Sequence, residues 1–92
     1  MIFEWDEGKN QINIEKHKIS FETAAHVFDD PMYIEMYDFE HSTDEDRYIA
    51  IGMVGKVLFV VFTERREKIR LISARLATEK ERRLYYDQDI CD

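Results

Sequence analysis

The longest apolar run in the chain lies near its middle and has the length of one β-strand. Residues 57–64, Val-Leu-Phe-Val-Val-Phe-Thr-Glu, are rich in β-branched and aromatic side chains, which predicts a central strand covered on both faces. Residues 69–75, Ile-Arg-Leu-Ile-Ser-Ala-Arg, form a second strand-like run. The polar residues 65–68 give a short turn between the two runs, so the pair predicts a β-hairpin.

The second strand carries two arginines, which are unusual next to a core strand. Side chains alternate between the two faces of a sheet along each strand. Arg70 and Arg75 differ by an odd number of residues, so an unbroken strand directs them to opposite faces. They can serve one site only if the strand ends, or contains a bulge, before Arg75.

The N-terminal third predicts a short strand followed by two helices. Residues 2–5 are an expected edge strand, and Asp6 is a favourable N-cap for a helix that continues to His17. Ser20 is expected to cap a second helix with one apolar stripe, which Pro31 ends.

The first of these helices has a polar face. Asn10, Asn13 and His17 are three and four residues apart and therefore share that face, with Lys9 and Lys16 beside them. We interpret this face as one that can meet a ligand.

The rest of the chain predicts two more strands and a closing helix. Residues 32–37 and 47–53 alternate in polarity as strands do, and the acidic segment 38–46 between them has no periodicity and predicts a loop. Thr78 and Glu81 have the spacing of a capping box, which predicts a helix over 79–88.

This order of elements, β-α-α-β-β-β-β-α, predicts one α+β domain over residues 1–92. It would hold two N-terminal helices, an antiparallel sheet of about four strands plus the short N-terminal strand, and a C-terminal helix. With 45% hydrophobic residues, a chain of this size can bury a single core without disulfides.

Composition places the chain among proteins of a reducing cytoplasm. Cys91 is the only cysteine, so it can form neither an internal disulfide nor a multi-cysteine metal site. The N-terminus has no signal-like segment, and no apolar stretch is long enough to cross a membrane, so no membrane partner is expected.

The charge is unevenly distributed along the chain. The net charge of −7 argues against a generic nucleic-acid binder, because phosphate contacts dominate such binding. Residues 1–46 hold 3 Lys against 13 acids, whereas residues 47–92 hold 10 Lys and Arg, including all seven arginines, against 7 acids. The asymmetry fits either a basic face on an acidic protein or an ordinary solvated surface.

The candidate chemistry is cleavage of a phosphodiester without metal or cofactor. The chain has no phosphate-binding glycine loop, and its histidines lack the spacing of metal ligands. Cleavage needs a base, an acid and cations near the phosphate. Residues of these types are Arg47, Arg70, Arg75, Lys16 and His17, with Trp5, Tyr48, Tyr85 and Tyr86 for stacking on a base.

Each of these residues also has a purely structural interpretation. Arg47 and Arg70 can be strand-edge charges beside carboxylates, and His17 can cap the end of its helix. Trp5 can belong to the core. From the residue types alone, both interpretations stay open.

Several short segments together resemble a known family. They are Phe-Glu-Trp-Asp at 3–6, Lys-Asn at 9–10, Lys-His at 16–17, Val-Phe-Asp-Asp-Pro at 27–31, Val-Val-Phe-Thr-Glu at 60–64, Ile-Arg-Leu-Ile-Ser-Ala-Arg at 69–75 and Glu-Arg-Arg at 81–83. In this order and spacing, over nearly the whole chain, they resemble the BrnT family of toxins.

The resemblance implies the toxin of a bacterial type II toxin–antitoxin pair, with a fold similar to RelE-type ribonucleases. The implied activity is that of a metal-independent endoribonuclease that inhibits translation by cutting RNA. The net charge of −7 favours either cleavage of free RNA or a toxin that binds through a local basic patch. The implied partner is a BrnA-like antitoxin, and only its complex with the toxin would bind operator DNA. The alternatives are an inactive binding module that acts as co-repressor, and an unrelated small cytosolic domain.

The resemblance also suggests roles for individual residues. Arg70 or Arg75 is expected to stabilise the transition state, and His17 or Lys16 to help with proton transfer. We expect the antitoxin to bury the arginine-bearing face. The candidate catalytic residues are Arg70, Arg75, His17, Lys16 and Glu64, and the candidate RNA-binding residues are Trp5, Lys9, Arg47, Tyr85, Arg82 and Arg83.

Overall fold

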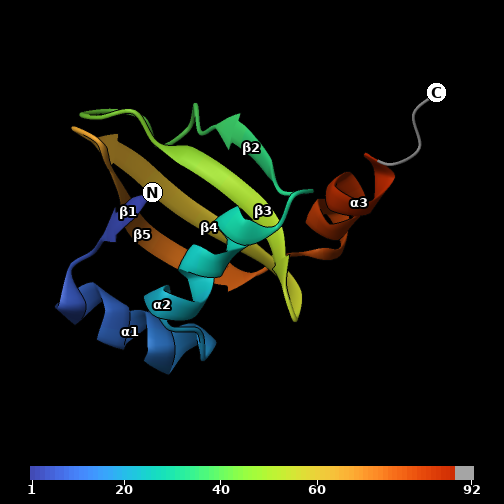
Figure 1. Ribbon diagram of the computed structural model, residues 1–92, viewed down its shortest axis with the longest axis horizontal. Helices are drawn as coiled ribbons and strands as arrows, with labels where there is room; N and C mark the ends of the chain where they lie inside the picture. The colour runs from blue at the N-terminus through green and yellow to red at the C-terminus, as the bar shows by residue number, and fades with distance from the viewer. Residues whose placement is uncertain (89–92) are drawn as a thin grey trace.

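The computed structural model describes residues 1–88, and its elements follow the predicted order (Figure 1). Cys91 lies outside the described residues. The predicted second helix is divided into a short α-helix and a 3-10 helix. The helices are α1 (Glu7–His17), α2 (Phe21–Ala24), η1 (Ala25–Asp29) and α3 (Glu79–Asp87), and the strands are β1 (Ile2–Glu4), β2 (Ile34–Tyr37), β3 (Tyr48–Val54), β4 (Lys56–Arg65) and β5 (Lys68–Leu76).

The strands form one sheet in the order β1-β5-β4-β3-β2. The predicted four-stranded antiparallel part is confirmed, since β2 to β5 pair antiparallel with their neighbours, and β4 is central as predicted. The N-terminal strand differs, because β1 pairs parallel to β5. A parallel pair needs a connection of a dozen or more residues, and residues 5–67, which include the helices and β2 to β4, provide it. The α+β class is confirmed.

The helix ends follow the capping signals in the sequence. The Asp6 side chain accepts a hydrogen bond from the Lys9 backbone N–H, and both halves of the predicted capping box are formed between Thr78 and Glu81. These bonds satisfy amides that a helix leaves unpaired at its start. In the part of the chain that the structure describes, no helix has the length and apolar character to cross a membrane.

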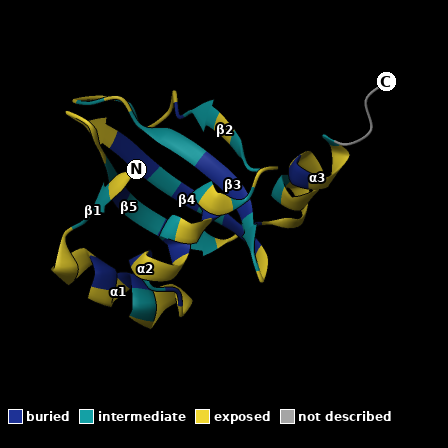
Figure 2. Cartoon of the chain, in the orientation of Figure 1, coloured by how far each residue is buried: buried dark blue, intermediate teal, exposed yellow. Residues whose placement is uncertain are grey.

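Two hydrophobic clusters lie on opposite faces of the sheet. Figure 2 shows the buried residues in dark blue along β3 and β4 and on the helices. The larger cluster joins the sheet to α2 and η1, and its fully buried side chains include Phe21, Val27, Val60, Phe62 and Leu71. α1 contacts β5 on the same side of the sheet. We call this side the helical face. The smaller cluster lies beneath α3 on the other side and consists of Ile51, Val57, Ala77 and Tyr85.

The side that carries Phe59, Val61 and Thr63 is here named the open face. It is covered by α3 at one end and by the loop 38–46 at the other. Phe59 packs with the cluster beneath α3, and the Thr63 hydroxyl donates to the Asp46 carbonyl of the loop (2.6 Å). Between these two covers, β4 and β5 remain accessible.

A bulge in β5 changes the alternation expected from its sequence. Val61 of β4 pairs with Ser73, whereas the next residue, Phe62, pairs with Leu71. Ile72 is therefore an extra residue in β5, and the alternation beyond it is shifted by one position. Of the two alternatives, an unbroken strand or one that ends or bulges before Arg75, the structure has the bulge.

The bulge brings the two arginines of β5 to the same face. Arg70 lies opposite Thr63 and Arg75 lies opposite Phe59, and these partners are four residues apart on β4. Both arginines consequently lie on the open face. Their Cα atoms are about 13 Å apart, because their partners are four residues apart and a strand rises about 3.3 Å per residue. The condition under which they can serve one surface is met.

Candidate functional site

The polar face of α1 is turned mostly inward. Asn13 donates from Nδ2 to the carbonyl oxygens of Ile19 and Ala74 (2.9 Å each) and accepts at Oδ1 from the Ala74 N–H (3.2 Å). Asn10 accepts at Oδ1 from the Phe21 N–H (2.8 Å). Both asparagines are buried, so the expectation that they meet a ligand is wrong.

Asn13 nevertheless helps to build the site, because it fixes α1 against β5. β1 pairs with residues 68–70, and among residues 1–88 no other strand lies beside β5 beyond that point on this side. The Asn13 amide bonds both backbone groups of Ala74, as a neighbouring strand would. This anchors the helix that carries the candidate cations beside the bulge.

A shallow hollow of about 180 Å³, here named the helix hollow, lies along this seam. The structure brings together three of the predicted site residues here, because Lys9, Lys16 and His17 are all exposed on α1 and all line it. Its full lining is Lys9, Ile12, Asn13, Lys16, His17, Ile72 and Ser73.

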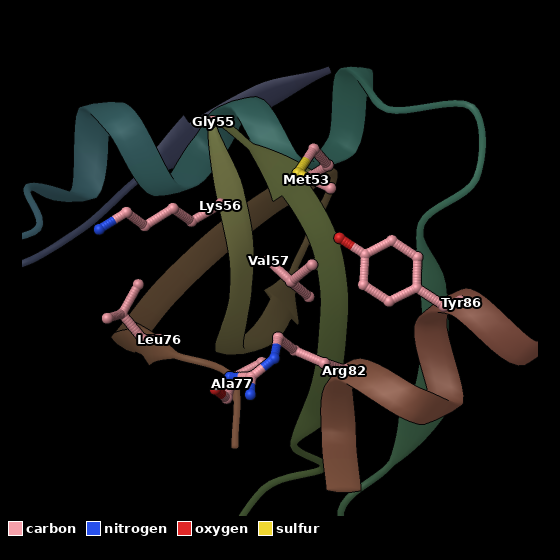
Figure 3. Close-up of a pocket in the computed structure, with 8 residues that line it drawn as sticks. All are labelled: Met53, Gly55, Lys56, Val57, Leu76, Ala77, Arg82 and Tyr86. Carbon is pink, nitrogen blue, oxygen red and sulfur yellow. Dashed lines mark hydrogen bonds between the residues drawn. The ribbon is translucent and has the colours of Figure 1, made fainter. Parts of the chain in front are cut away.

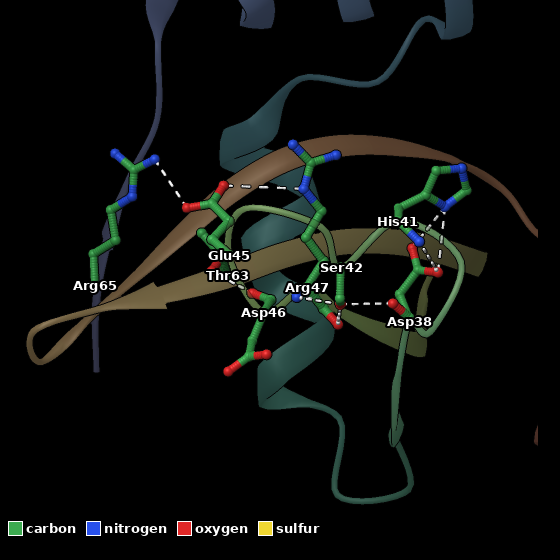
Figure 4. Close-up of polar contacts among 8 residues, drawn as sticks. All are labelled: Asp38, His41, Ser42, Glu45, Asp46, Arg47, Thr63 and Arg65. Carbon is green, nitrogen blue, oxygen red and sulfur yellow. Dashed lines mark hydrogen bonds and ion pairs between the residues drawn. The ribbon is translucent and has the colours of Figure 1, made fainter.

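Hydrogen bonds order the acidic loop on the other side of the bulge (Figure 4). The Asp38 N–H donates to the Arg47 carbonyl (2.8 Å). The Ser42 hydroxyl donates to the Asp38 carbonyl (2.6 Å) and accepts from the Arg47 N–H (2.8 Å). Together with the Thr63–Asp46 bond, these contacts close the loop over the end of the sheet.

The loop places a histidine beside Arg47. His41 Nδ1 lies 3.0 Å from Oδ2 of Asp38, whose side chain is only 9% exposed, while the imidazole is 61% exposed. Arg47 Nε is buried without a hydrogen-bond partner among the described residues, and Glu45 Oε2 lies 3.9 Å from it. In Figure 4, the side chains of Arg47 and His41 extend to the same side of the loop.

These groups line a second hollow of about 150 Å³, here named the loop hollow, which shares Ile72 and Ser73 with the helix hollow. His41 is not among the site residues predicted from the sequence, although its spacing of three residues from Asp38 was a usable signal. The lining residues are Asp38, His41, Arg47, Val61, Ile72 and Ser73.

The two arginines of β5 differ in how firmly they are held. Arg70 Nη1 lies 3.3 Å from Glu4 Oε2, a single contact across the β1–β5 pair. Arg75 binds Glu81 through both terminal nitrogens (2.8 and 3.0 Å), and its guanidinium lies 3.9 Å from the centre of the Phe59 ring. Arg75 thus joins β5 to α3, while Arg70 is less constrained.

Two other predicted site residues, Glu64 and Trp5, lie away from the bulge. Glu64 pairs with Ile69, which puts it on the helical face, opposite to Arg70 and Arg75. Trp5 packs edge-on against Phe21 of the main core. The structure does not bring either residue to the arginines of β5.

Tyr85 is a buried residue of the α3 cluster. Its hydroxyl donates to Asp30, which also accepts from the N–H groups of Met32 and Met53. Burial opposes ionisation of Asp30, but these three hydrogen bonds outweigh it and lower the pKa of this carboxyl. Little of the Tyr85 ring is accessible, so its predicted stacking on an RNA base has no surface here.

The last two predicted residues, Arg82 and Arg83, lie exposed on α3. Arg83 pairs with Glu79 (3.2 Å), and Arg82 donates to the Ala77 carbonyl (3.1 Å). Figure 3 shows Arg82 and Tyr86 reaching from α3 over a separate hollow of about 270 Å³ next to the β3–β4 turn. Neither arginine lines the two hollows at the bulge.

The arrangement at the bulge can bind and polarise a phosphodiester. The two hollows share Ile72 and Ser73, and each contains one imidazole. The helix hollow adds two lysines to its histidine, and the loop hollow adds Arg47. Cations of this kind stabilise the charge that develops on a reacting phosphate, and imidazoles transfer protons near neutral pH. Within residues 1–88, no group of three or more His, Cys, Asp or Glu side chains is placed to hold a metal ion.

Comparison with known proteins agrees with this chemistry. No curated protein sequence matches the chain. The crystal structure of the ribonuclease toxin BrnT from Brucella abortus is similar, with a TM-score of 0.66 and 25% sequence identity over 86% of this chain and 100% of that one. Residues 5–81 match the model of the family described as the ribonuclease toxin, BrnT, of type II toxin–antitoxin systems. The chain belongs to the BrnT family of ribonuclease toxins.

Proposed function

We propose that this chain is an active, metal-independent endoribonuclease that inhibits translation in the cytoplasm by cutting RNA. The observation that carries the proposal is the bulge at Ile72. It turns Arg70 and Ser73 to the open face and leaves basic groups on both sides of Ser73. A likeness to RelE-type ribonucleases stays a prediction.

Arg47 and Arg70 are the arginines best placed to stabilise the transition state. Arg47 immediately precedes Tyr48, the first residue of β3, which pairs with Phe62 of β4. Arg47 therefore lies beside Thr63, the next residue of β4, and Arg70 of β5 pairs with Thr63 from the other side. Strands lie about 4.8 Å apart, which puts the two Cα atoms about 10 Å from each other. Long side chains from this separation can reach one phosphate between them.

The α1 residues supply the other parts of the reaction. Lys16 and His17 are candidates for proton transfer, and Lys9 for binding the RNA backbone, because all three line the helix hollow. Arg75 has its guanidinium engaged with Glu81 and Phe59, and its catalytic role is the least supported among the predicted cations.

The test is RNA cleavage by the purified protein in the presence of EDTA. We expect the parent to cut cellular RNA, and Arg47→Ala and Arg70→Ala to cut on the order of 10²-fold more slowly. Lys80→Ala, which removes an exposed cation on α3, is the matched control and should cut at the parental rate. A parent that cuts no RNA, or arginine variants that cut as fast as the parent, would refute the proposal.

A type II system implies an antitoxin partner, and we propose that it is a BrnA-like protein that covers the open face. This face supports the proposal because its cations are accessible between α3 and the loop. Its complex with the toxin would bind operator DNA. Induced expression should arrest growth, and the product of the neighbouring gene should rescue it. An interface mapped wholly to residues 38–46 would contradict the proposed docking face.

An inactive binding module is the second candidate, and one observation favours it. Within residues 1–88, five arginines pair with carboxylates: Arg47 and Arg65 with Glu45, Arg70 with Glu4, Arg75 with Glu81 and Arg83 with Glu79. Such a module would be harmless when expressed alone, would cut no RNA, and would still form a tight complex with a small partner.

A further inference from the structure

We propose that His41 is the general base of this ribonuclease and that Asp38 is its positioning residue. The inference rests on the proposed function and names a catalytic group for it. It comes from the loop hollow, where a histidine bound to a buried carboxylate lies beside Arg47.

The contact with Asp38 fixes the tautomer of His41. Nδ1 lies 3.0 and 3.3 Å from the two carboxylate oxygens. A carboxylate can only accept, so Nδ1 carries the proton and Nε2 is left as the acceptor. The His41 backbone N–H also donates to Asp38 Oδ1 (3.3 Å), which closes the contact into a ring.

Asp38 is itself held firmly. Its side chain is buried, its N–H donates to the Arg47 carbonyl, and its carbonyl accepts from the Ser42 hydroxyl. The orientation of the imidazole is therefore set before any substrate binds, which is what a proton-transfer group requires. The charged groups that line the hollow with His41 are Asp38 and Arg47, and Glu45 faces Arg47 from the same loop.

A second histidine pair shows that spacing alone does not make such a site. His26 Nδ1 lies 2.9 Å from Asp29 Oδ2, also three residues apart, but both side chains are mostly exposed (67% and 78%). The hollow beside His26 contains Glu22 and Asp29 and no lysine or arginine. A phosphate would meet repulsion there, whereas at His41 it meets Arg47.

The proposed step is an internal transfer of the phosphodiester. His41 Nε2 takes the proton of the ribose 2′-hydroxyl as the 2′ oxygen forms a bond to phosphorus. The bond from phosphorus to the 5′ oxygen breaks, and that oxygen receives a proton from a general acid, for which His17 or Lys16 across Ser73 is placed. The products are a 2′,3′-cyclic phosphate and a 5′-hydroxyl, and water restores both protonation states.

The test compares His41→Ala with His26→Ala in the cleavage assay. We expect a loss of about 10²-fold or more for His41→Ala, the usual contribution of a general base, and the parental rate for His26→Ala. Thermal melting checks that each variant is folded. Added imidazole should restore part of the activity of His41→Gly, which a structural defect would not allow. The cleaved RNA should carry the cyclic phosphate.

Asp38→Asn tests the positioning role by the split between kcat and KM. It should lower kcat with little change in KM, because the imidazole loses the contact that fixes its tautomer and orientation while Arg47 can still bind the phosphate. If His41→Ala cuts at the parental rate while Arg47→Ala is impaired, the role of His41 is refuted and the ribonuclease proposal stands. If the parent cuts no RNA, both proposals are refuted together.

Discussion

The two faces of the sheet are covered in different ways. On the helical face, α1, α2 and η1 enclose a continuous core of aromatic and aliphatic side chains, among them Phe21 and Phe62. On the open face, α3 and the loop 38–46 cover only the two ends, and cations lie between them. The helical face is therefore buried by apolar side chains, whereas the open face combines apolar contacts with exposed polar groups.

This difference shows how a chain of 92 residues can hold both a core and a candidate reaction centre. The helical face supplies most of the buried apolar surface, which is the main source of folding free energy. The open face is left with space for a bulge, for a loop with a buried carboxylate and for arginines that are not fully paired. The site depends on the core but shares few residues with it.

Truncation of one phenylalanine on each face should show the contrast directly. Phe62→Ala removes a fully buried ring that contacts Phe28 and Tyr48, and we expect it to lower the free energy of unfolding by about 3–5 kcal/mol. Phe59→Ala removes a partly exposed ring beneath Arg75, and the expected loss is about 1–2 kcal/mol. Urea unfolding measures both, and equal losses would contradict the contrast.

The helical face was predictable because it follows local rules. The caps at Asp6 and Ser20 and the apolar run over 57–64 were enough to place the helices of this face and the central strand. These signals are local in sequence, so one chain suffices to recognise them. The parallel pairing of β1 was not predictable in this way, because β1 pairs with the edge strand β5, which lies far along the sequence.

The open face was harder to predict because it depends on register. The bulge at Ile72 follows from the pairing of β4 with β5, and no residue type marks it. For the same reason, the residue types alone did not single out His41, because its contact with Asp38 depends on the closure of the loop. Asn13 shows the opposite error, since a polar residue was assigned to a ligand but serves the fold.

Asn13 lies where the two faces meet, and its loss should affect both. In Asn13→Ala, the N–H and C=O of Ala74 lose their partner in the interior, and each buried unsatisfied group costs about 1–3 kcal/mol. Because some relaxation will reduce this, we expect the free energy of unfolding to fall by about 2 kcal/mol. Cleavage should also slow, since α1 no longer holds Lys16 and His17 at the bulge.

Gln11→Ala is the matched control for Asn13→Ala, because it removes an amide from the exposed side of the same helix. Its stability should change by less than about 0.5 kcal/mol. If the two variants lost equal stability in urea unfolding, the anchoring role of Asn13 would be excluded.

The smallest expected effect is a difference in how acidification destabilises the two faces of the sheet. On the open face, Glu81 is partly buried, which opposes its ionisation, but hydrogen bonds from Arg75 and Thr78 and the charge of Arg75 lower its pKa below the ordinary 4.5. The pKa of Asp30 beneath α3 is lowered in the same sense from 3.8. A carboxyl whose pKa is lower in the folded state stabilises the fold above its unfolded pKa. That contribution is lost as the pH falls through the folded value.

Acidification below about pH 4.5 should therefore loosen α3 before it affects the main core, whose buried polar groups on α1 are the neutral amides of Asn10 and Asn13. Amide hydrogen exchange at pH 3 to 5 can measure this, with earlier loss of protection expected in α3 than in α1. Glu81→Gln should be less stable at neutral pH and should lose less stability on acidification. Glu7→Gln is the control, because the lowered pKa of Glu7 arises from hydrogen bonds of Gln11, Asn10 and Trp5 in full contact with solvent, where such bonds contribute little. If α1 and α3 lost protection at the same pH, the two helices would not respond separately to acid, and the prediction would be wrong.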